Sequence, residues 1–197
     1  MFARTERLLL RPGWIEDAPA LAKAIGEESV VRNLATAPWP YREEQAMEFL
    51  AKPINPAEPR FLIFSRTGAA PRLVGGCGIS PSPDGAPEMG YWIARPYWGL
   101  GFATEAGRQL LRIARAMQLP KLSAGHFLDN PASGAVLRKL GFRPTGRITQ
   151  RYSLARGGAA DCALFEEGDG DDGAVTPMRG RIGVDEDFRQ ELRLLAA

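Results

Sequence analysis

The sequence has few of the residues from which metal centres and disulfide frameworks are built. Its 197 residues include two cysteines, Cys77 and Cys162, far apart in the chain, and one histidine, His126. Zinc sites use closely spaced Cys and His ligands, and disulfide-stabilised domains contain many cysteines. We therefore expect no metal ion and two reduced thiols, as is usual in the cytoplasm.

The chain also lacks a strong charge of one sign and a long apolar run. The 25 basic and 23 acidic residues leave a net charge of +2, which is too small to indicate nucleic acid as the main partner. The leucine run at residues 8–10 is too short for a membrane span or a signal sequence. We expect a cytoplasmic protein that binds neither nucleic acid nor membrane.

With 45% hydrophobic residues, the chain is long enough for one well-buried core. We expect a single main domain over residues 1–167. The following residues, 168–197, begin with a glycine-rich acidic segment and continue with apolar residues at helical spacing. They predict a flexible break and a C-terminal helical appendage.

Hydrophobic patterns predict strands and helices in mixed order. Helices are expected over residues 15–25, 42–50, 105–118 and 130–141, where apolar residues recur on one face or capping residues mark the ends. Short connections in the middle of the chain predict an antiparallel meander of three strands. The expected strands are residues 6–11, 61–66, 72–80, 88–94, 121–128, 142–154 and 161–167.

The segment with the clearest chemistry is YWGLGFATEA, residues 97–106. It runs from an apolar strand through Gly99 and Gly101 directly into an amphipathic helix. Glycine lets the backbone come close to a ligand, and the first N–H groups of a helix have no partner within the helix. The junction predicts an anion site suited to a pyrophosphate, although a tight strand-to-helix turn is the alternative interpretation.

Two common nucleotide motifs do not match this junction. The dinucleotide motif GxGxxG needs a third glycine where Thr104 stands. A P-loop needs Gly-Lys-Ser or Gly-Lys-Thr at the helix start, and the segment has no lysine. ATP and dinucleotides are therefore poor candidates for the bound anion.

Three segments together resemble the GNAT superfamily of acyl-CoA-dependent N-acyltransferases, and within it the RimJ/RimL-like branch. They are TERLLLRP, GYWIARPYWGLGFATEA and NPASGAVLRKLGF, and the resemblance runs from Thr5 to Glu167. It implies an α/β (α+β) fold whose mixed, mostly antiparallel, twisted sheet has helices on both faces. It also implies acetyl-CoA as the cofactor and direct transfer of an acetyl group to a primary amine in a ternary complex.

The resemblance assigns cofactor contacts residue by residue. The family's pyrophosphate loop, Q/R-x-x-G-x-G/A, begins here at Trp98, and an aromatic residue followed by glycine is typical of the RimJ/RimL-like branch. Backbone groups of the strand that separates from its neighbour are implied to hold the pantetheine arm. The expected cofactor-binding residues are Ile93, Ala94, Trp98, Gly99, Leu100, Gly101, Phe102, Ala103, Thr104 and Asn130.

The catalytic residues follow from the same resemblance and from their surroundings. Many family members have a tyrosine in the helix after the fifth strand, where this chain has Leu137, whereas the branch pattern N-x-x-S matches Asn130 and Ser133. Ser133 is the expected acid or thiolate hydrogen-bond donor, although an N-cap and a first-turn serine explain both residues structurally. Glu88 is the candidate base, with a solvated hairpin end as the alternative. Trp39, in a proline-flanked loop, is expected to line the acceptor pocket.

The sequence does not identify the acceptor amine or the oligomeric state. A protein N-terminus and a small-molecule amine both fit the resemblance, and the loops over residues 29–41 and 80–87 contain no recognisable specificity motif. A non-catalytic acyl-CoA-binding or regulatory module is the alternative function, because of Leu137. A nucleotide-dependent enzyme is a weaker one. The oligomeric state is undecided, with a homodimer among the options.

Overall fold

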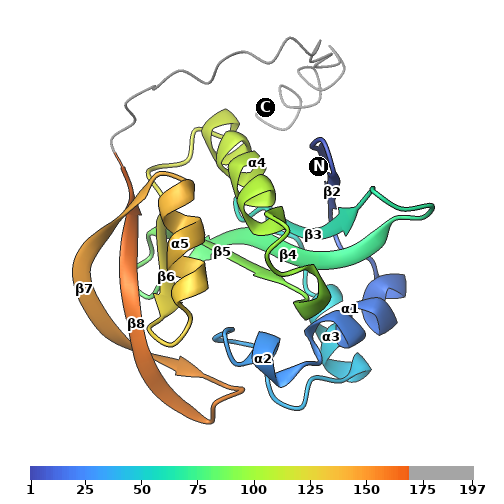
Figure 1. The fold of residues 1–197 in the computed structure, drawn as a ribbon, viewed down its shortest axis with the longest axis horizontal. Coiled ribbons are helices and arrows are strands. Elements are labelled where there is room, and N and C mark those ends of the chain that lie inside the picture. Colours follow the sequence, from blue (N-terminus) through green and yellow to red (C-terminus); the bar gives the residue numbers. More distant parts are fainter. Residues whose placement is uncertain (169–197) are drawn as a thin grey trace.

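The computed structural model describes residues 1–168 of the chain. Its strands form one sheet in the order β1-β2-β3-β4-β5-β6-β8-β7, antiparallel throughout except for the parallel pair β5–β6. The predicted mixed, mostly antiparallel sheet is thereby confirmed (Figure 1). The strands are β1 (Ala3–Arg4), β2 (Leu8–Arg11), β3 (Arg60–Ser65), β4 (Arg72–Pro81), β5 (Pro87–Ile93), β6 (Ser123–Phe127), β7 (Phe142–Ser153) and β8 (Gly158–Glu167).

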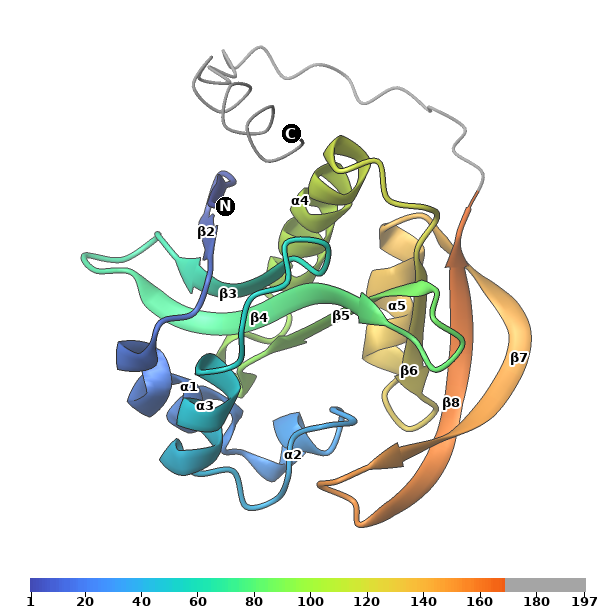
Figure 2. The same cartoon turned by 180° about the vertical axis from the view of Figure 1, so that it is seen from behind.

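Helices lie on both faces of this sheet, as Figures 1 and 2 show from opposite sides. Helices α4 and α5 cover one face, and α1 and α3 cover the other. None of the helices in residues 1–168 is long and apolar enough to cross a lipid bilayer. The helices are α1 (Ala18–Ile25), α2 (Glu28–Val31), α3 (Glu43–Leu50), α4 (Phe102–Ala116) and α5 (Pro131–Lys139), with short 3-10 turns η1 (Ile15–Asp17) and η2 (Arg95–Tyr97).

The alternation of side chains along β3 divides the core into two layers. Phe61 and Ile63 are buried with the residues of α4, whereas Leu62 and Phe64 are buried with those of α1 and α3. Successive side chains of a strand point to opposite faces of a sheet. The continuous apolar sequence of β3 therefore reflects a strand that is covered on both sides.

The structure corrects the sequence prediction in three places. The strand expected over residues 6–11 is a β1–β2 hairpin, in which Thr5 N–H donates to Leu8 O at 3.0 Å. Helix α4 begins at Phe102, before the expected start at residue 105. The four-residue helix α2 was not predicted, because so short a segment carries no periodic pattern. The C-terminal appendage predicted for residues 168–197 lies outside the described residues, apart from Gly168.

A buried ion pair connects the N-terminal hairpin to α1. The two Nη atoms of Arg11 donate to the two carboxylate oxygens of Asp17, each at 2.7 Å, and the side chains are 12% and 11% exposed. The Arg11 guanidinium also stacks between the rings of Trp14 and Phe64, at 4.0 and 4.1 Å from their centroids. This contact fixes the start of α1 against the edge of the sheet.

Asp17→Asn is expected to lower the free energy of unfolding by about 2 kcal/mol, because it leaves the largely buried Arg11 charge without its charged partner. Burial opposes ionisation of the Asp17 carboxyl, but hydrogen bonds from Arg11 and the Trp14 N–H hold its pKa below the ordinary value. The stabilisation is thus present above the unfolded-state pKa of about 4 and is lost as pH falls through the lower folded-state pKa. Denaturant unfolding at several pH values checks this, with the exposed Glu16→Gln as control. Equal loss in both variants at neutral pH contradicts it.

Candidate functional site

The sheet opens between β5 and β6. Their parallel pairing covers Glu88 with Ser123 and Met89 with Ala124, although β5 continues to Ile93 and β6 to Phe127. The two strands separate toward their C-terminal ends (Figure 1). Backbone groups on the facing edges therefore have no strand partner beyond this pairing within residues 1–168, and such groups are obligatory hydrogen-bonding partners.

The register of β5 decides which of its backbone groups face the opening. Ala94 N–H donates to Val74 O at 2.9 Å, so Ala94 is bonded to β4. In an antiparallel pair, successive residues turn their N–H and C=O groups to alternate sides. Trp92 therefore also faces β4, whereas Tyr91 and Ile93 turn their backbone groups toward the opening.

This register changes one expected cofactor contact. Ala94 has its N–H in the β4 pairing, and its C=O accepts from Tyr97 N–H at 2.9 Å. Ile93 faces the opening as expected, but its C=O accepts from the indole Nε1 of Trp98 at 2.6 Å. The N–H of Ile93 and both backbone groups of Tyr91 are thus the groups available to a pantetheine arm. Tyr91 was not predicted, because register is a property of the folded sheet.

The glycine loop forms one edge of the opening. Gly99 and Gly101 have φ values of +77° and +78°, a region that glycine adopts without strain. Gly101 is the N-cap residue of α4 and has no side-chain cap, and the first helical hydrogen bond runs from Glu105 N–H to Gly101 O at 3.0 Å. The preceding N–H groups, those of residues 102–104, are left for an anion, to which the positive end of the helix dipole adds attraction.

An arginine that sequence reasoning missed holds this loop in place. Arg7, in the β1–β2 turn, donates from Nη1 to Leu100 O at 2.9 Å and from Nε to Glu105 Oε2 at 2.7 Å. Burial opposes ionisation of Glu105, but hydrogen bonds from Thr5 and Arg7 hold its pKa below the ordinary value. The Arg7 Nη2 atom also lies 3.5 Å from where a Cβ on Gly101 would stand. The TERLLLRP motif contains both Thr5 and Arg7, but nothing in its spacing indicates this contact.

The start of α5 forms the opposite edge. The Asn130 side chain caps the helix by accepting from Ser133 N–H at 3.3 Å, as the sequence predicted. The Ser133 hydroxyl lies 2.8 Å from the Tyr91 hydroxyl, which also donates to Ser133 O at 3.0 Å. Leu137, where many family members have tyrosine, is only 1% exposed and packs in the main core. The Ser133 and Tyr91 hydroxyl groups therefore meet between the start of α5 and β5.

A pocket of about 520 Å³ lies where the two edges meet α2. Asp129, next to Asn130, accepts from Arg32 at 2.9 Å and from both Nη atoms of Arg156 at 2.9 Å. The Arg156 hydrogen bonds hold the pKa of Asp129 below its ordinary value, with further help from the Arg32 charge. The pocket is lined by Glu28, Ser29, Arg32, Asn33, Trp98, Asp129 and Asn130.

Two other expected site residues have surroundings that the sequence did not indicate. Trp39 is 43% exposed and does not belong to the residues that line this pocket. Glu88 lies at the start of β5, where both of its carboxylate oxygens accept from the Arg151 guanidinium of β7. The side chains of Glu88 and Arg151 are 15% and 24% exposed. Because Arg151 engages both carboxylate oxygens, the ion pair favours a structural role for Glu88.

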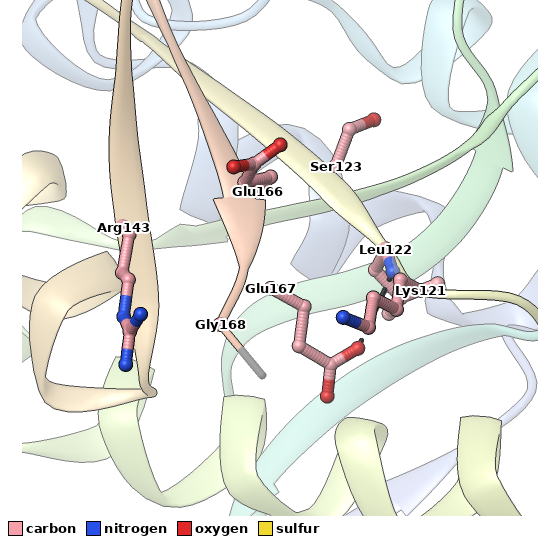
Figure 3. A pocket seen from close by; sticks show the side chains of 7 residues that line it. All are labelled: Lys121, Leu122, Ser123, Arg143, Glu166, Glu167 and Gly168. Atoms are coloured by element: carbon pink, nitrogen blue, oxygen red, sulfur yellow. Dashed lines mark hydrogen bonds between the residues drawn. The ribbon is translucent and has the colours of Figure 1, made fainter. Parts of the chain in front are cut away.

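A second pocket, of about 320 Å³, lies at the opposite end of β6 (Figure 3). Its charges are in part engaged with one another, because Glu167 pairs with Arg115 at 2.9 Å and accepts from Leu122 N–H at 3.3 Å. Residues 1–168 contain no group of three or more His, Cys, Asp or Glu side chains that could hold a metal ion. The lining residues are Lys121, Leu122, Ser123, Arg143, Glu166, Glu167 and Gly168.

Comparison with known proteins identifies the family. A family model described as "Acetyltransferase (GNAT) domain" matches residues 7–143, which is most of the chain. The chain belongs to the GNAT acetyltransferase family. It is an N-acetyltransferase that uses acetyl-CoA, so the predicted enzyme class and cofactor are confirmed.

One relative and two solved structures resemble this GNAT acetyltransferase at low sequence identity. "Uncharacterized N-acetyltransferase p20" of Bacillus licheniformis is 27% identical over 169 residues, which cover 82% of this chain and 92% of the relative. A GNAT-family acetyltransferase structure from Bacillus anthracis has a TM-score of 0.71 at 21% identity, over 84% of this chain and 97% of the other. The RimL ribosomal L7/L12 alpha-N-protein acetyltransferase, solved with coenzyme A, has a TM-score of 0.68 at 19% identity, over 84% and 97%. These structures confirm the fold.

The described residues of this GNAT acetyltransferase fit acetyl-CoA. The open side of Gly99, where a Cβ would meet no atom within 4 Å, and the N–H groups of residues 102–104 suit the pyrophosphate. The outward backbone groups of Tyr91 and Ile93 suit the amide-containing pantetheine arm. Of the loop residues expected from the sequence, residues 98–104, Trp98 lines the pocket of about 520 Å³ together with Asn130.

Gly101→Glu is expected to abolish coenzyme A binding, because it adds negative charge and bulk where the diphosphate is expected. Gly85→Glu is the matched control: Gly85 lies in the β4–β5 turn with φ +83° against +78° for Gly101, and its Cβ would meet nothing within 4 Å. Both variants therefore carry similar backbone strain. Calorimetric titration with coenzyme A checks the prediction, and comparable affinity in the two variants refutes the loop assignment.

Proposed function

We propose that this enzyme acetylates α-amines, such as a protein N-terminus or a small molecule with an amine of similar basicity, in preference to lysine-like amines. The observation that carries the proposal is the state of the carboxylates around the opening. Glu88 is held by Arg151, and Asp129 is held by Arg156 and Arg32. Glu28, the other carboxylate that lines the pocket, is exposed on the first turn of α2.

Amine basicity explains why paired carboxylates favour α-amines. From reference pKa values, about a tenth of an α-amine is neutral at pH 7, against well under ~0.1% of a lysine ε-amine. Only the neutral amine has the lone pair that forms the new C–N bond. A site without a buried, unpaired carboxylate among its described residues gives little help in removing a proton. An acceptor that is already partly neutral needs little help.

In this proposal the two edges of the opening have different tasks. Acetyl-CoA supplies the acetyl group and a thiol leaving group when it is bound. The glycine loop and α4 bind its diphosphate, and Tyr91 and Ile93 bind the arm and orient it. The Ser133 hydroxyl, at the positive end of α5, donates a hydrogen bond at Oγ to the sulfur that carries negative charge as the C–S bond breaks. The amine nitrogen loses one proton as the C–N bond forms, and the leaving sulfur gains one proton as it becomes a thiol.

The family match supports an enzyme over the non-catalytic acyl-CoA-binding module. Among structures of similar fold, the RimL enzyme is named an alpha-N-protein acetyltransferase, and a Vibrio fischeri protein is named a ribosomal-protein-S5-alanine acetyltransferase. These names agree with an α-amine acceptor. Trp39 as an acceptor contact, the cytoplasmic location, a homodimer and the separate C-terminal appendage stay predictions.

Free-thiol release from acetyl-CoA, measured across two matched sets of peptides, tests the acceptor class. Peptides with a free N-terminus and no lysine are expected to react about two orders of magnitude faster at pH 7 than N-terminally blocked peptides with one lysine, in line with their neutral fractions. The rate with the α-amine is expected to level off near the amine's own pKa of about 8. Equal rates with both sets contradict the α-amine preference, and no thiol release with any amine favours the non-catalytic module.

A further inference from the structure

We propose that Tyr91 is a positioning residue that sets the Ser133 hydroxyl for hydrogen bonding to the sulfur of coenzyme A. The inference rests on the proposed role of Ser133 and adds a residue to which the sequence assigned no role. Tyr91 lies on β5 two residues past the end of its pairing with β6, and Ser133 lies in the first turn of α5. Their hydroxyl groups therefore connect the two sides of the opening.

One proton on the Tyr91 hydroxyl has two acceptors within reach. They are Ser133 O at 3.0 Å and Ser133 Oγ at 2.8 Å. When Tyr91 donates to the carbonyl, the Ser133 Oγ–H can donate to the phenol oxygen. When Tyr91 donates to Oγ instead, the Ser133 proton is free to point to another acceptor. Rotation about the phenol C–O bond of Tyr91 and the Cβ–Oγ bond of Ser133 interconverts these arrangements. Each proton stays on its own oxygen.

A thiolate favours the second arrangement, in which Tyr91 donates to Oγ and the Ser133 proton can point to the sulfur. A hydrogen bond to a charged acceptor is stronger than one to a neutral oxygen, so negative charge on the sulfur draws the Ser133 proton away from Tyr91. The Tyr91 proton then turns to Oγ and polarises the Ser133 hydroxyl. In this way Tyr91 keeps Ser133 oriented before the sulfur is charged and strengthens it as a donor afterwards.

The ionisation of Tyr91 fits a donor that keeps its proton. Burial raises the pKa of the phenol to about 12, although the hydrogen bond with Ser133 acts in the opposite direction. An ordinary thiol has a pKa of about 8.5, so a thiolate does not take the proton of such a phenol at neutral pH. Tyr91 therefore acts through Ser133 and keeps its proton. The proton of the product thiol corresponds to the one that the amine loses.

The thiol pKa of coenzyme A bound without an acceptor tests this contact directly. It is followed by the ultraviolet absorbance of the thiolate in wild type, Tyr91→Phe, Ser133→Ala and the exposed control Tyr152→Phe. We expect Tyr91→Phe and Ser133→Ala to raise the ionisation pH of the bound thiol by about one unit, from the strength of a hydrogen bond to a charged group. Tyr152→Phe, whose residue is 57% exposed on β7, is expected to leave it unchanged.

The kinetic constants of Tyr91→Phe distinguish a positioning role of Tyr91 from a role in packing alone. Tyr91→Phe is expected to lower kcat about tenfold, with the KM for acetyl-CoA changed less than twofold, because the interaction strengthens only as charge appears on the sulfur. In the Ser133→Ala background, Tyr91→Phe is expected to add no further loss, which is the non-additivity of residues that act as a unit. Retained coenzyme A affinity shows that each variant is folded.

Each outcome decides one question. If Tyr91→Phe changes neither the bound thiol pKa nor kcat, Tyr91 is only a packing residue and the inference is wrong, while the proposed function stands. If Tyr91→Phe costs as much in the Ser133→Ala background as in wild type, Tyr91 acts independently of Ser133 and the inference is again wrong. If the thiol pKa responds as expected but no amine releases thiol, the contact is confirmed and the proposed function fails.

Discussion

The early end of pairing between β5 and β6 is the constraint on which the site depends. Backbone N–H and C=O groups need hydrogen-bond partners, and the antiparallel register with β4 leaves those of Tyr91 and Ile93 pointing into the opening. A pantetheine arm carries amides that match such groups. The glycine loop follows β5 and α5 follows β6, so in the proposed site the diphosphate and thioester ends of one ligand meet opposite edges of one gap.

Ion pairs from distant parts of the chain contact the elements on either side of this gap. Arg7 connects the N-terminal hairpin to the glycine loop and to α4. Arg151 connects β7 to Glu88, just before the strands separate. Arg156 connects the β7–β8 hairpin to Asp129 and, through Arg32 O at 2.7 Å, to α2. Each side of the opening is thus fixed from outside the two strands that form it.

The parts of the site that local chemistry determines could be read from the sequence. Gly99, Gly101 and the Asn130 cap follow from backbone and capping preferences that act over a few residues. The pairing of Glu88 with Arg151 and of Tyr91 with Ser133 joins residues 63 and 42 positions apart, and no local pattern encodes either contact. For the same reason the sequence did not indicate that Arg151 binds Glu88, and it missed Tyr91.

Amide hydrogen exchange in the presence and absence of coenzyme A tests the central claim, that the gap between β5 and β6 receives the pantetheine arm. The account predicts that coenzyme A slows exchange at Tyr91 and Ile93, whose N–H groups face the gap. It also predicts little change at Trp92 and Ala94, whose N–H groups are already bonded to β4. Unchanged exchange at Tyr91 and Ile93 with saturating coenzyme A contradicts the account.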